Sequence, residues 1–257
     1  MLLAIDVGNT TITIGLFEDD RLNATWRIAT EHRRLTDEYA VILLNLLEAH
    51  GLARDEIKEC VFSSVVPDLV PVFETLSRKH LGVKPLVVDT GTKTGVRIRY
   101  DSPRDVGADR IADVVGATKR YGPPPLIIVD LGTALVFDAI DAEGDYLGGA
   151  LAPGIGIAAE ALYERAAKLH PVELARPPTA IGKNTVTALQ SGLFFGTVGM
   201  IEGMVARFKA ELGGHAKVIG TGGWAELIGR GANVFDVVDP DLTLHGLRLI
   251  YETNREG

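Results

Sequence analysis

The chain contains one pattern twice, first as Leu3-Ala4-Ile5-Asp6-Val7-Gly8-Asn9-Thr10 and again as Ile127-Ile128-Val129-Asp130-Leu131-Gly132-Thr133-Ala134. Each copy is an apolar run followed by an aspartate, an apolar residue, a glycine and a small polar residue. A second apolar run follows each copy, Thr11–Phe17 and Leu135–Ile140, which predicts two strands joined by a tight turn. Repetition at equivalent places predicts two copies of one α/β unit that face each other across a cleft.

The rest of the sequence alternates short apolar runs with helical patterns, which predicts an α/β fold. Further strands are expected at Leu2–Ile5, Cys60–Val66, Leu86–Asp89, Leu126–Asp130, Ala134–Ile140 and Lys217–Gly220. Helices are expected around Tyr39–Leu47 with Gly51 as the C-cap, and at Asp68–His80, Ile155–His170 and Val186–Leu212. The prolines of Gly122–Pro125 cannot continue a helix, so we place a domain boundary there, between residues 1–121 and 122–257.

Composition limits the possible partners and the compartment. The 257 residues carry a net charge of −8, which argues weakly against nucleic acid or a membrane surface as the main partner. Cys60 is the single cysteine, so we expect a buried thiol in a reducing compartment. Asp6 interrupts the N-terminal apolar run, so no signal peptide is expected. These features predict a soluble cytoplasmic protein.

The repeated Asp-x-Gly turn has a specific chemistry. Its glycine lets the backbone approach a ligand, and successive N–H groups in such a turn form an anion site. An aspartate at the strand end can bind Mg²⁺ directly or through water. The alternative is a plain hairpin turn, because Asp, Gly and Asn all favour turns. Two copies favour a phosphate site.

Three other motifs carry candidate chemistry. Val218–Gly223 is a strand that enters a glycine-rich loop, which is either a nucleotide contact or a plain turn. Gly107-Ala108-Asp109-Arg110 precedes a helical pattern, so Asp109 is either a general base beside an anion-binding arginine or a helix cap. Gly148–Ile155 is dense in glycine and proline, which is typical of close backbone approach. Neither a P-loop motif nor a Gly-x-Ser-x-Gly elbow occurs in the sequence.

Together these motifs resemble the acetate and sugar kinase, Hsp70 and actin superfamily, and within it the type III pantothenate kinases. The segments that carry this resemblance occur in the family's order: Ile5–Thr10, Ser63-Ser64-Val65-Val66-Pro67, Gly107–Arg110, Asp130–Ala134, Gly148–Gly154 and Gly182-Lys183-Asn184-Thr185. They span nearly the whole chain. Family members often carry threonines soon after the second Gly-Thr-Ala, where this chain has Leu135-Val136-Phe137.

The resemblance implies two actin-like, ribonuclease H-like domains with mixed sheets flanked by helices and an ATP cleft between them. It implies ATP-dependent phosphorylation of pantothenate to 4'-phosphopantothenate, the first step of coenzyme A biosynthesis, by a homodimer that uses Mg²⁺ and a monovalent cation, K⁺ or NH₄⁺. Asp109 would be the catalytic base, Asp130 the K⁺ ligand, and Asp6 the Mg²⁺ ligand through water. ATP contacts are expected at Asp6, Val7, Gly8, Asn9, Thr10, Thr11, Ile12, Thr13 and Thr133. Pantothenate contacts are expected at Tyr100, Gly107, Ala108, Asp109, Arg110 and Thr185.

Two other functions remain open for the same fold. One is a regulatory or accessory nucleotide-binding protein, and the other is a phosphatase or polyphosphate hydrolase that would release phosphate without an acceptor. The dimer is expected to form through the second half, where Ile155–His170 and Val186–Leu212 are rich in apolar residues.

Overall fold

The computed structural model describes residues 1–166 and 168–255, and the chain forms two compact units. The first unit contains Met1–Gly95, Asp101–Gly116 and the C-terminal helix α7 (Leu242–Arg255). The second contains Val96–Tyr100 and Ala117–Asp241. These units differ from halves divided at residue 121, because the C-terminal helix belongs with the N-terminal sheet and a five-residue segment belongs with the second unit.

Within the described residues, the first unit is built on a mixed five-stranded sheet with the order β3-β2-β1-β4-β5. The strands are β1 (Leu2–Val7), β2 (Thr11–Glu18), β3 (Arg21–Ala29), β4 (Glu59–Ser64) and β5 (Leu86–Val87). The first three pair antiparallel, whereas β4 pairs parallel to both β1 and β5. Its helices and helical turns are α1 (Thr36–Ala49), Arg54–Glu56, Pro67–Leu69, α2 (Val70–Leu76), Ser77–Leu81, Pro103–Asp105 and the first part of α3 (Ala108–Tyr121).

The two faces of this sheet are covered by different helices. Leu3, Ile5 and Val7 of β1 are buried in one apolar cluster with side chains of α1 and α2. Successive strand residues face opposite sides, so Asp6 lies on the other face. Helix α7 covers that face and contacts β1, β2 and β4; Gly15, the partner of Ala4, lies against Leu244.

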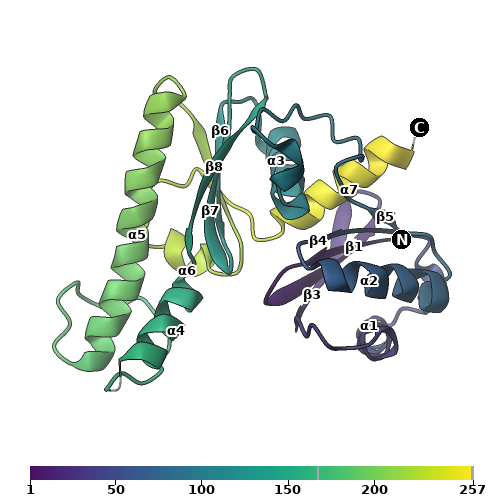
Figure 1. The fold of residues 1–257 in the computed structure, drawn as a ribbon, viewed down its shortest axis with the longest axis horizontal. Coiled ribbons are helices and arrows are strands. Elements are labelled where there is room, and N and C mark those ends of the chain that lie inside the picture. The colour runs from purple at the N-terminus through teal and green to yellow at the C-terminus, as the bar shows by residue number, and fades with distance from the viewer. Residues whose placement is uncertain (167, 256–257) are drawn as a thin grey trace. The chain divides into compact units, whose positions relative to one another are not determined.

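The second unit repeats this topology strand for strand, with the order β10-β9-β6-β7-β8. The strands are β6 (Leu126–Leu131), β7 (Ala134–Ile140), β8 (Tyr146–Pro153), β9 (Lys217–Thr221) and β10 (Val237–Val238). Antiparallel and parallel pairs fall at the same places as in the first sheet. Helices α4 (Ile155–Arg165), α5 (Thr185–Glu211) and α6 (Ala225–Gly229) complete the unit (Figure 1). The predicted α/β fold with mixed sheets flanked by helices is confirmed.

Most predicted elements are present, with some corrections. Strand Ala134–Ile140 has the predicted bounds, and α1 ends before Gly51, which has a φ of 78°. The helix expected over Ile155–His170 ends at Arg165, because Ala166 is extended; residue 167 lies outside the described residues. Strands β3 and β8 and helix α7 were not predicted. Cys60 is a buried free thiol, and burial raises its pKa to about 12.

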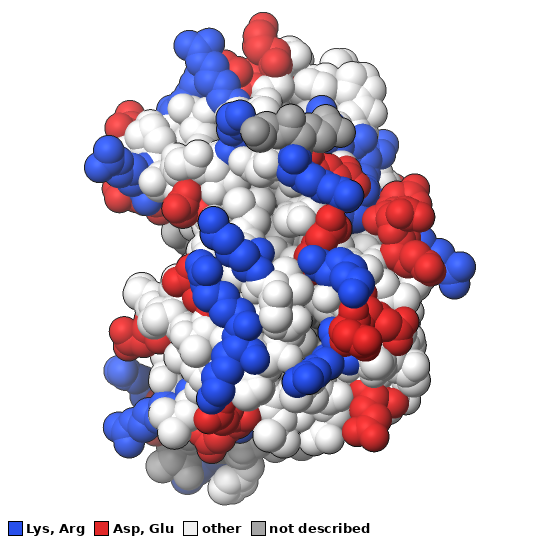
Figure 2. Space-filling view, turned by 90° about the vertical axis from the view of Figure 1, so that its right-hand side faces the viewer, with Lys and Arg blue, Asp and Glu red and all other residues white. Residues whose placement is uncertain are grey.

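Helix α5 is long and apolar enough, by length and composition alone, to cross a membrane. It buries Leu193, Phe194, Val198 and Ile201 in the core of the second unit. One such helix is weak evidence for a membrane span. Basic and acidic side chains are interspersed on the surface in Figure 2, consistent with the modest net charge of −8.

Candidate active site

Asp6 stands at the end of β1, in the middle of a row of three polar side chains. Its antiparallel partner is Thr13 on β2 and its parallel partner is Ser63 on β4. Directly paired residues point to the same face of a sheet, so the three side chains lie side by side. The Ser63 hydroxyl donates a hydrogen bond of 2.7 Å to Asp6 Oδ1 and is itself fully buried. Ser63 therefore holds the Asp6 carboxylate in one orientation.

Asp109 lies in the first turn of α3, close enough to Asp6 for the two carboxylates to repel each other. Burial, and next the negative charge of Asp109, raise the pKa of Asp6 to about 7, while the hydrogen bond from Ser63 opposes this rise. The Arg110 backbone N–H donates to Asp109 Oδ1 at 2.8 Å. The sequence motif thus places a second carboxylate beside the strand-end aspartate. Two carboxylates held this closely favour a cation between or beside them.

The turn after Asp6 is closed by its own backbone and supported by β3. The Gly8 N–H donates to the Thr11 carbonyl at 3.1 Å. Just beyond the end of β3, the Thr30 hydroxyl donates to the Gly8 carbonyl at 2.7 Å, and the Thr30 N–H donates to the Thr10 carbonyl at 2.9 Å. These bonds fix the turn from outside the repeat, and the sequence pattern gave no indication of Thr30.

Side chains of the predicted ATP-binding segment point in different directions. Val7 and Ile12 are fully buried in the core and pair with each other across the hairpin, so their side chains cannot reach a ligand. Asn9, Thr10 and Thr11 are exposed at the turn. The segment therefore offers a phosphate its backbone N–H groups and exposed polar side chains, which is the arrangement that an anion site needs.

Asp130 occupies the equivalent place at the end of β6. Its parallel partner on β9 is Thr221, whose buried hydroxyl has no hydrogen-bond partner among the described residues. Its antiparallel partner on β7 is Val136, an apolar residue where the first unit has Thr13. Gly222 follows with a φ of 91°, and a Cβ there would overlap Asp130 Oδ1. Only glycine lets this backbone pass so close to the carboxylate.

Thr133 is exposed on the turn after Asp130, and its carbonyl accepts a 3.1 Å hydrogen bond from the Gly154 N–H. Gly154 ends the glycine-rich motif and begins α4, and a Cβ at this position would overlap the Thr133 carbonyl. Gly154 thus brings its backbone into close contact with the Thr133 carbonyl, and most of the segment Gly148–Ile155 is strand β8.

The remaining predicted contacts are divided between the two units. Gly107, Ala108 and Arg110 belong to the first unit with Asp109, whereas Tyr100 and Thr185 belong to the second. Thr185 begins α5 and lines a cavity of about 650 Å³, together with Gly182, Lys183, Asn184 and Leu162. Tyr100 lies against β8, with its ring stacked on Tyr146.

The donor groups of both strand ends fit cations. The Asp6–Asp109 pair offers carboxylate oxygens, which Mg²⁺ prefers, and burial together with the charge of Asp109 raises the pKa of Asp6. Near Asp130, the buried hydroxyl of Thr221 is an oxygen donor without a protein partner among the described residues. A buried unpaired hydroxyl is costly unless a ligand satisfies it.

Sequence reasoning found the aspartates and glycines but gave no role to Ser63, Thr30 or Thr221. Ser63 belongs to the motif Ser63–Pro67, and its parallel pairing with Asp6 lets its hydroxyl orient the Asp6 carboxylate. Ser64 continues the same motif by bonding to both the N–H and the carbonyl of Val66, which closes the turn after β4. The signal that could have identified these partners is a serine or threonine at the end of the strand that pairs parallel to the aspartate's strand, Ser63 on β4 and Thr221 on β9.

Residues 2–207 match the family model described as type III pantothenate kinase. A type III pantothenate kinase from Roseiflexus sp. (strain RS-1) is 52% identical over 255 residues, which is 99% of this chain and 100% of the relative. One from Moorella thermoacetica is 53% identical over 254 residues, with 99% and 100% coverage. A solved structure from Campylobacter jejuni, assigned in its description to the Baf family of transcriptional activators, aligns with a TM-score of 0.63 at 19% identity, covering 99% and 100% of the two chains. At that identity it shows the fold alone.

Proposed function

The chain belongs to the type III pantothenate kinase family, and from that premise we propose a role for each part of the site. The fold is that of the actin-like ATPases, and the activity is transfer of a phosphoryl group from ATP to pantothenate, as in coenzyme A biosynthesis. The observation that carries the residue-level proposal is the charge-coupled pair of Asp6 and Asp109 beside a backbone turn able to hold phosphate.

Asp109 is the general base in this proposal. It orients the primary hydroxyl of pantothenate and accepts its proton as the oxygen attacks the γ-phosphorus of ATP. The bond from that phosphorus to the β–γ bridging oxygen breaks, and ADP leaves. A carboxylate suffices for this role because phosphoryl transfer depends mainly on positioning and charge stabilisation.

Asp6 and the turn that follows it hold the triphosphate. Backbone N–H groups of Asn9 to Thr11 would donate to phosphate oxygens, while the Gly8 N–H closes the turn on the Thr11 carbonyl and Thr30 supports the turn from behind. Asp6 would hold Mg²⁺ through water, in the orientation that Ser63 fixes. When bound, Mg²⁺ supplies positive charge that offsets the negative charge of the β- and γ-phosphates.

Asp130 and Thr221 hold the monovalent cation in this proposal, K⁺ or NH₄⁺, and Thr133 contacts the nucleotide. The support for this assignment is the unpartnered Thr221 hydroxyl beside a strand-end carboxylate. Val136 replaces a hydroxyl in this row, so carbonyl oxygens and water would complete the cation's shell.

Pantothenate binding is assigned to Tyr100, Gly107, Ala108, Arg110 and Thr185 as well as Asp109. Arg110 would bind the substrate carboxylate or stabilise the Gly107–Arg110 loop, since arginine binds carboxylates through two parallel hydrogen bonds. Thr185 lines a cavity with both apolar and polar walls, which suits an amphipathic acid.

The assay that tests the function is ADP release with ATP, Mg²⁺ and K⁺, measured with and without pantothenate. ADP release that requires pantothenate, with 4'-phosphopantothenate identified by mass, is expected. Phosphate release without an acceptor would instead indicate a phosphatase. A flat signal with intact ATP binding would indicate a regulatory or accessory protein.

A homodimer in the cytoplasm is the assembly and location that we assign. Helices α4 and α5 expose Ile157, Leu162, Val186 and Met200, an apolar surface typical of a protein contact. Light scattering should give twice the 27.5 kDa chain mass. A monomeric mass at assay concentration would contradict the dimer.

A further inference from the structure

We propose that the Arg99–Asp145 ion pair positions Tyr100 for pantothenate binding by holding the segment Val96–Tyr100 on strand β8. Arg99 and Asp145 touch no proposed substrate atom, so they act through Tyr100. The inference rests on the proposed role of Tyr100 as a substrate contact.

The segment Val96–Tyr100 is grouped with the second unit, although the residues before and after it belong to the first. Its backbone pairs with one residue of β8: the Tyr146 N–H donates to the Arg97 carbonyl at 2.9 Å, and the Arg99 N–H donates to the Tyr146 carbonyl at 2.8 Å. A single parallel bridge between Ile98 and Tyr146 is a short attachment. Side-chain ion pairs add to this backbone attachment.

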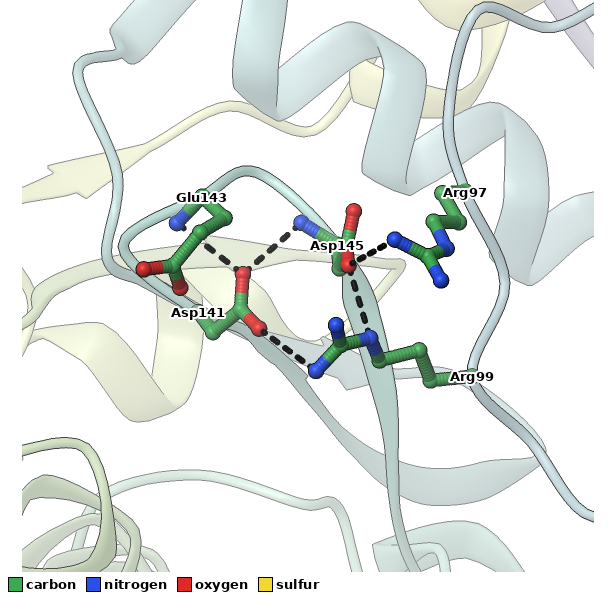
Figure 3. A network of polar contacts seen from close by, with 5 residues as sticks. All are labelled: Arg97, Arg99, Asp141, Glu143 and Asp145. Atoms are coloured by element: carbon green, nitrogen blue, oxygen red, sulfur yellow. Dashed lines mark hydrogen bonds and ion pairs between the residues drawn. The ribbon is translucent and has the colours of Figure 1, made fainter.

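The side-chain attachment is an ion-pair network at the turn between β7 and β8 (Figure 3). Arg99 Nε lies 2.7 Å from Asp145 Oδ2, and Arg99 NH1 lies 4.0 Å from Asp141 Oδ2. The Asp145 side chain is 12% exposed and that of Arg99 is 49% exposed. Arg97 approaches the same oxygen only to 3.7 Å and its side chain is 72% exposed. The short contact with a shielded carboxylate makes Arg99 the stronger of the two attachments.

The turn holds the two carboxylates in place for Arg99. Asp141 Oδ1 accepts hydrogen bonds from the N–H groups of Glu143 at 3.1 Å and Asp145 at 2.9 Å. Gly144 occupies the turn with a φ of 85°. An aspartate side chain that accepts hydrogen bonds from N–H groups later in its own turn makes that turn rigid. The turn therefore holds Asp141 and Asp145 in place for contact with Arg99.

Tyr100 follows Arg99 directly and rests on β8. Its ring stacks on Tyr146 with centroids 6.3 Å apart and an angle of 21°. Tyr146 is fully buried, and its hydroxyl donates to the buried Asp138 Oδ1 at 2.8 Å, so this platform is rigid. Gly148, with a φ of 122°, leaves room for the ring, since a Cβ there would come within 3.1 Å of two ring carbons. The Tyr100 position thus depends on the segment staying docked.

The test compares Arg99→Ala with the matched control Arg97→Ala, which removes the same charge from the same segment. We expect Arg99→Ala to raise KM for pantothenate by about threefold to tenfold, with kcat and KM for ATP nearly unchanged. Arg97→Ala should change KM for pantothenate by less than about twofold. Equal KM values for the two variants would overturn the proposal.

Two further variants separate this proposal from the function on which it rests. Tyr100→Ala should raise KM for pantothenate, and adding Arg99→Ala to it should have no further effect, because both changes disrupt one contact. If Tyr100→Ala leaves KM unchanged, the substrate contact itself is wrong. If Tyr100→Ala raises KM while Arg99→Ala does not, only the positioning role fails.

Should Arg99→Ala prove unfolded by thermal melting, Arg99→Lys keeps the charge and should raise KM for pantothenate by an intermediate amount. A wild-type KM in Arg99→Lys would overturn the proposal.

Discussion

The two strand-end aspartates occupy equivalent places in two sheets of the same topology, yet their neighbours differ. Asp6 lies between Thr13 and Ser63, and Ser63 donates to it at 2.7 Å. Asp130 lies between Val136 and Thr221, and the Thr221 hydroxyl has no hydrogen-bond partner among the described residues. Both units therefore have the same fold and an aspartate at the end of the equivalent strand, but the residues paired with that aspartate differ.

The proposal that the two carboxylates bind different ligands rests on this difference. In the first unit a protein hydroxyl fixes the aspartate, and a second carboxylate, Asp109, lies beside it. In the second unit the buried Thr221 hydroxyl has no hydrogen-bond partner among the described residues, and Gly222 brings the backbone close to Asp130. Four experiments test this contrast.

Asp109→Asn should give the largest effect, because Asp109 stands outside the repeat and has the proposed role of base. We expect kcat to fall by about 10²–10⁴-fold, with ATP binding retained in a direct binding measurement. Asp105→Asn, an exposed residue just before the motif, is the control and should keep wild-type turnover. Wild-type turnover in Asp109→Asn would remove the distinction between Asp109 and the two repeated aspartates.

Gly222→Ala tests the close approach of backbone to Asp130. The added Cβ would overlap the carboxylate at a positive φ, so the free energy of unfolding should fall by about 2–4 kcal/mol. Gly213 also has a positive φ, of 87°, but a Cβ there would meet open space. Gly213→Ala should therefore lower the free energy of unfolding by only about 1 kcal/mol. Equal losses in denaturant unfolding would show that the contact with Asp130 is unimportant.

Ser63→Ala and Thr221→Val test the two rows directly in protein free of nucleotide and added K⁺. Ser63→Ala removes a bond to a carboxylate and should destabilise the fold by about 1–2 kcal/mol. Thr221→Val keeps the shape and removes an unpaired hydroxyl, so stability should be unchanged or rise by up to about 1 kcal/mol. A Thr221→Val variant that is less stable than Ser63→Ala would contradict the contrast.

The pH dependence of stability tests the carboxylate of the first unit alone. The folded pKa of Asp6 is raised from 3.8 to about 7, so the folded state binds a proton that the unfolded state has released. Stability from this group is therefore full below about pH 4 and declines as pH rises toward 7. In metal-free protein the loss between pH 4 and 7 should be on the order of 4 kcal/mol, because the pKa is raised by about three units and each unit corresponds to about 1.4 kcal/mol.

Asp6→Asn should flatten that decline, because the raised pKa belongs to this carboxylate. Thermal melting in EDTA at several pH values provides the measurement. The same pH dependence of stability in Asp6→Asn and in the unchanged protein would mean that the pKa of Asp6 is not raised in the folded protein.

The sequence predicted the fold well wherever an apolar run ended at a functional residue. Both Asp-x-Gly strands and their hairpins were found, because buried strands have a distinctive composition. Strand β3 was missed because Arg21, Asn23 and Thr25 break any apolar run. Strand β8 was missed because Gly148, Gly149 and Pro153 are typical of turns.

The site could be predicted only as far as single motifs reach. The candidate residues Asp6 and Asp109 came from local patterns, but their proximity depends on packing between segments a hundred residues apart. The pairing of Asp6 with Ser63 and of Asp130 with Thr221 depends on parallel strand register, which periodicity does not encode. The repeat therefore predicted the aspartates and not their hydroxyl partners.

Helix α7 has a consequence for how the protein is made. It is the last helix of the chain, yet it covers the face of the first sheet that carries Asp6. A Cβ at Gly246 of α7 would overlap the Ala112 carbonyl of α3, so the two helices cross with their backbones in contact. During synthesis the first sheet therefore keeps one face uncovered until α7 has been translated. Completion of the first unit depends in this way on a segment made after the whole of the second sheet.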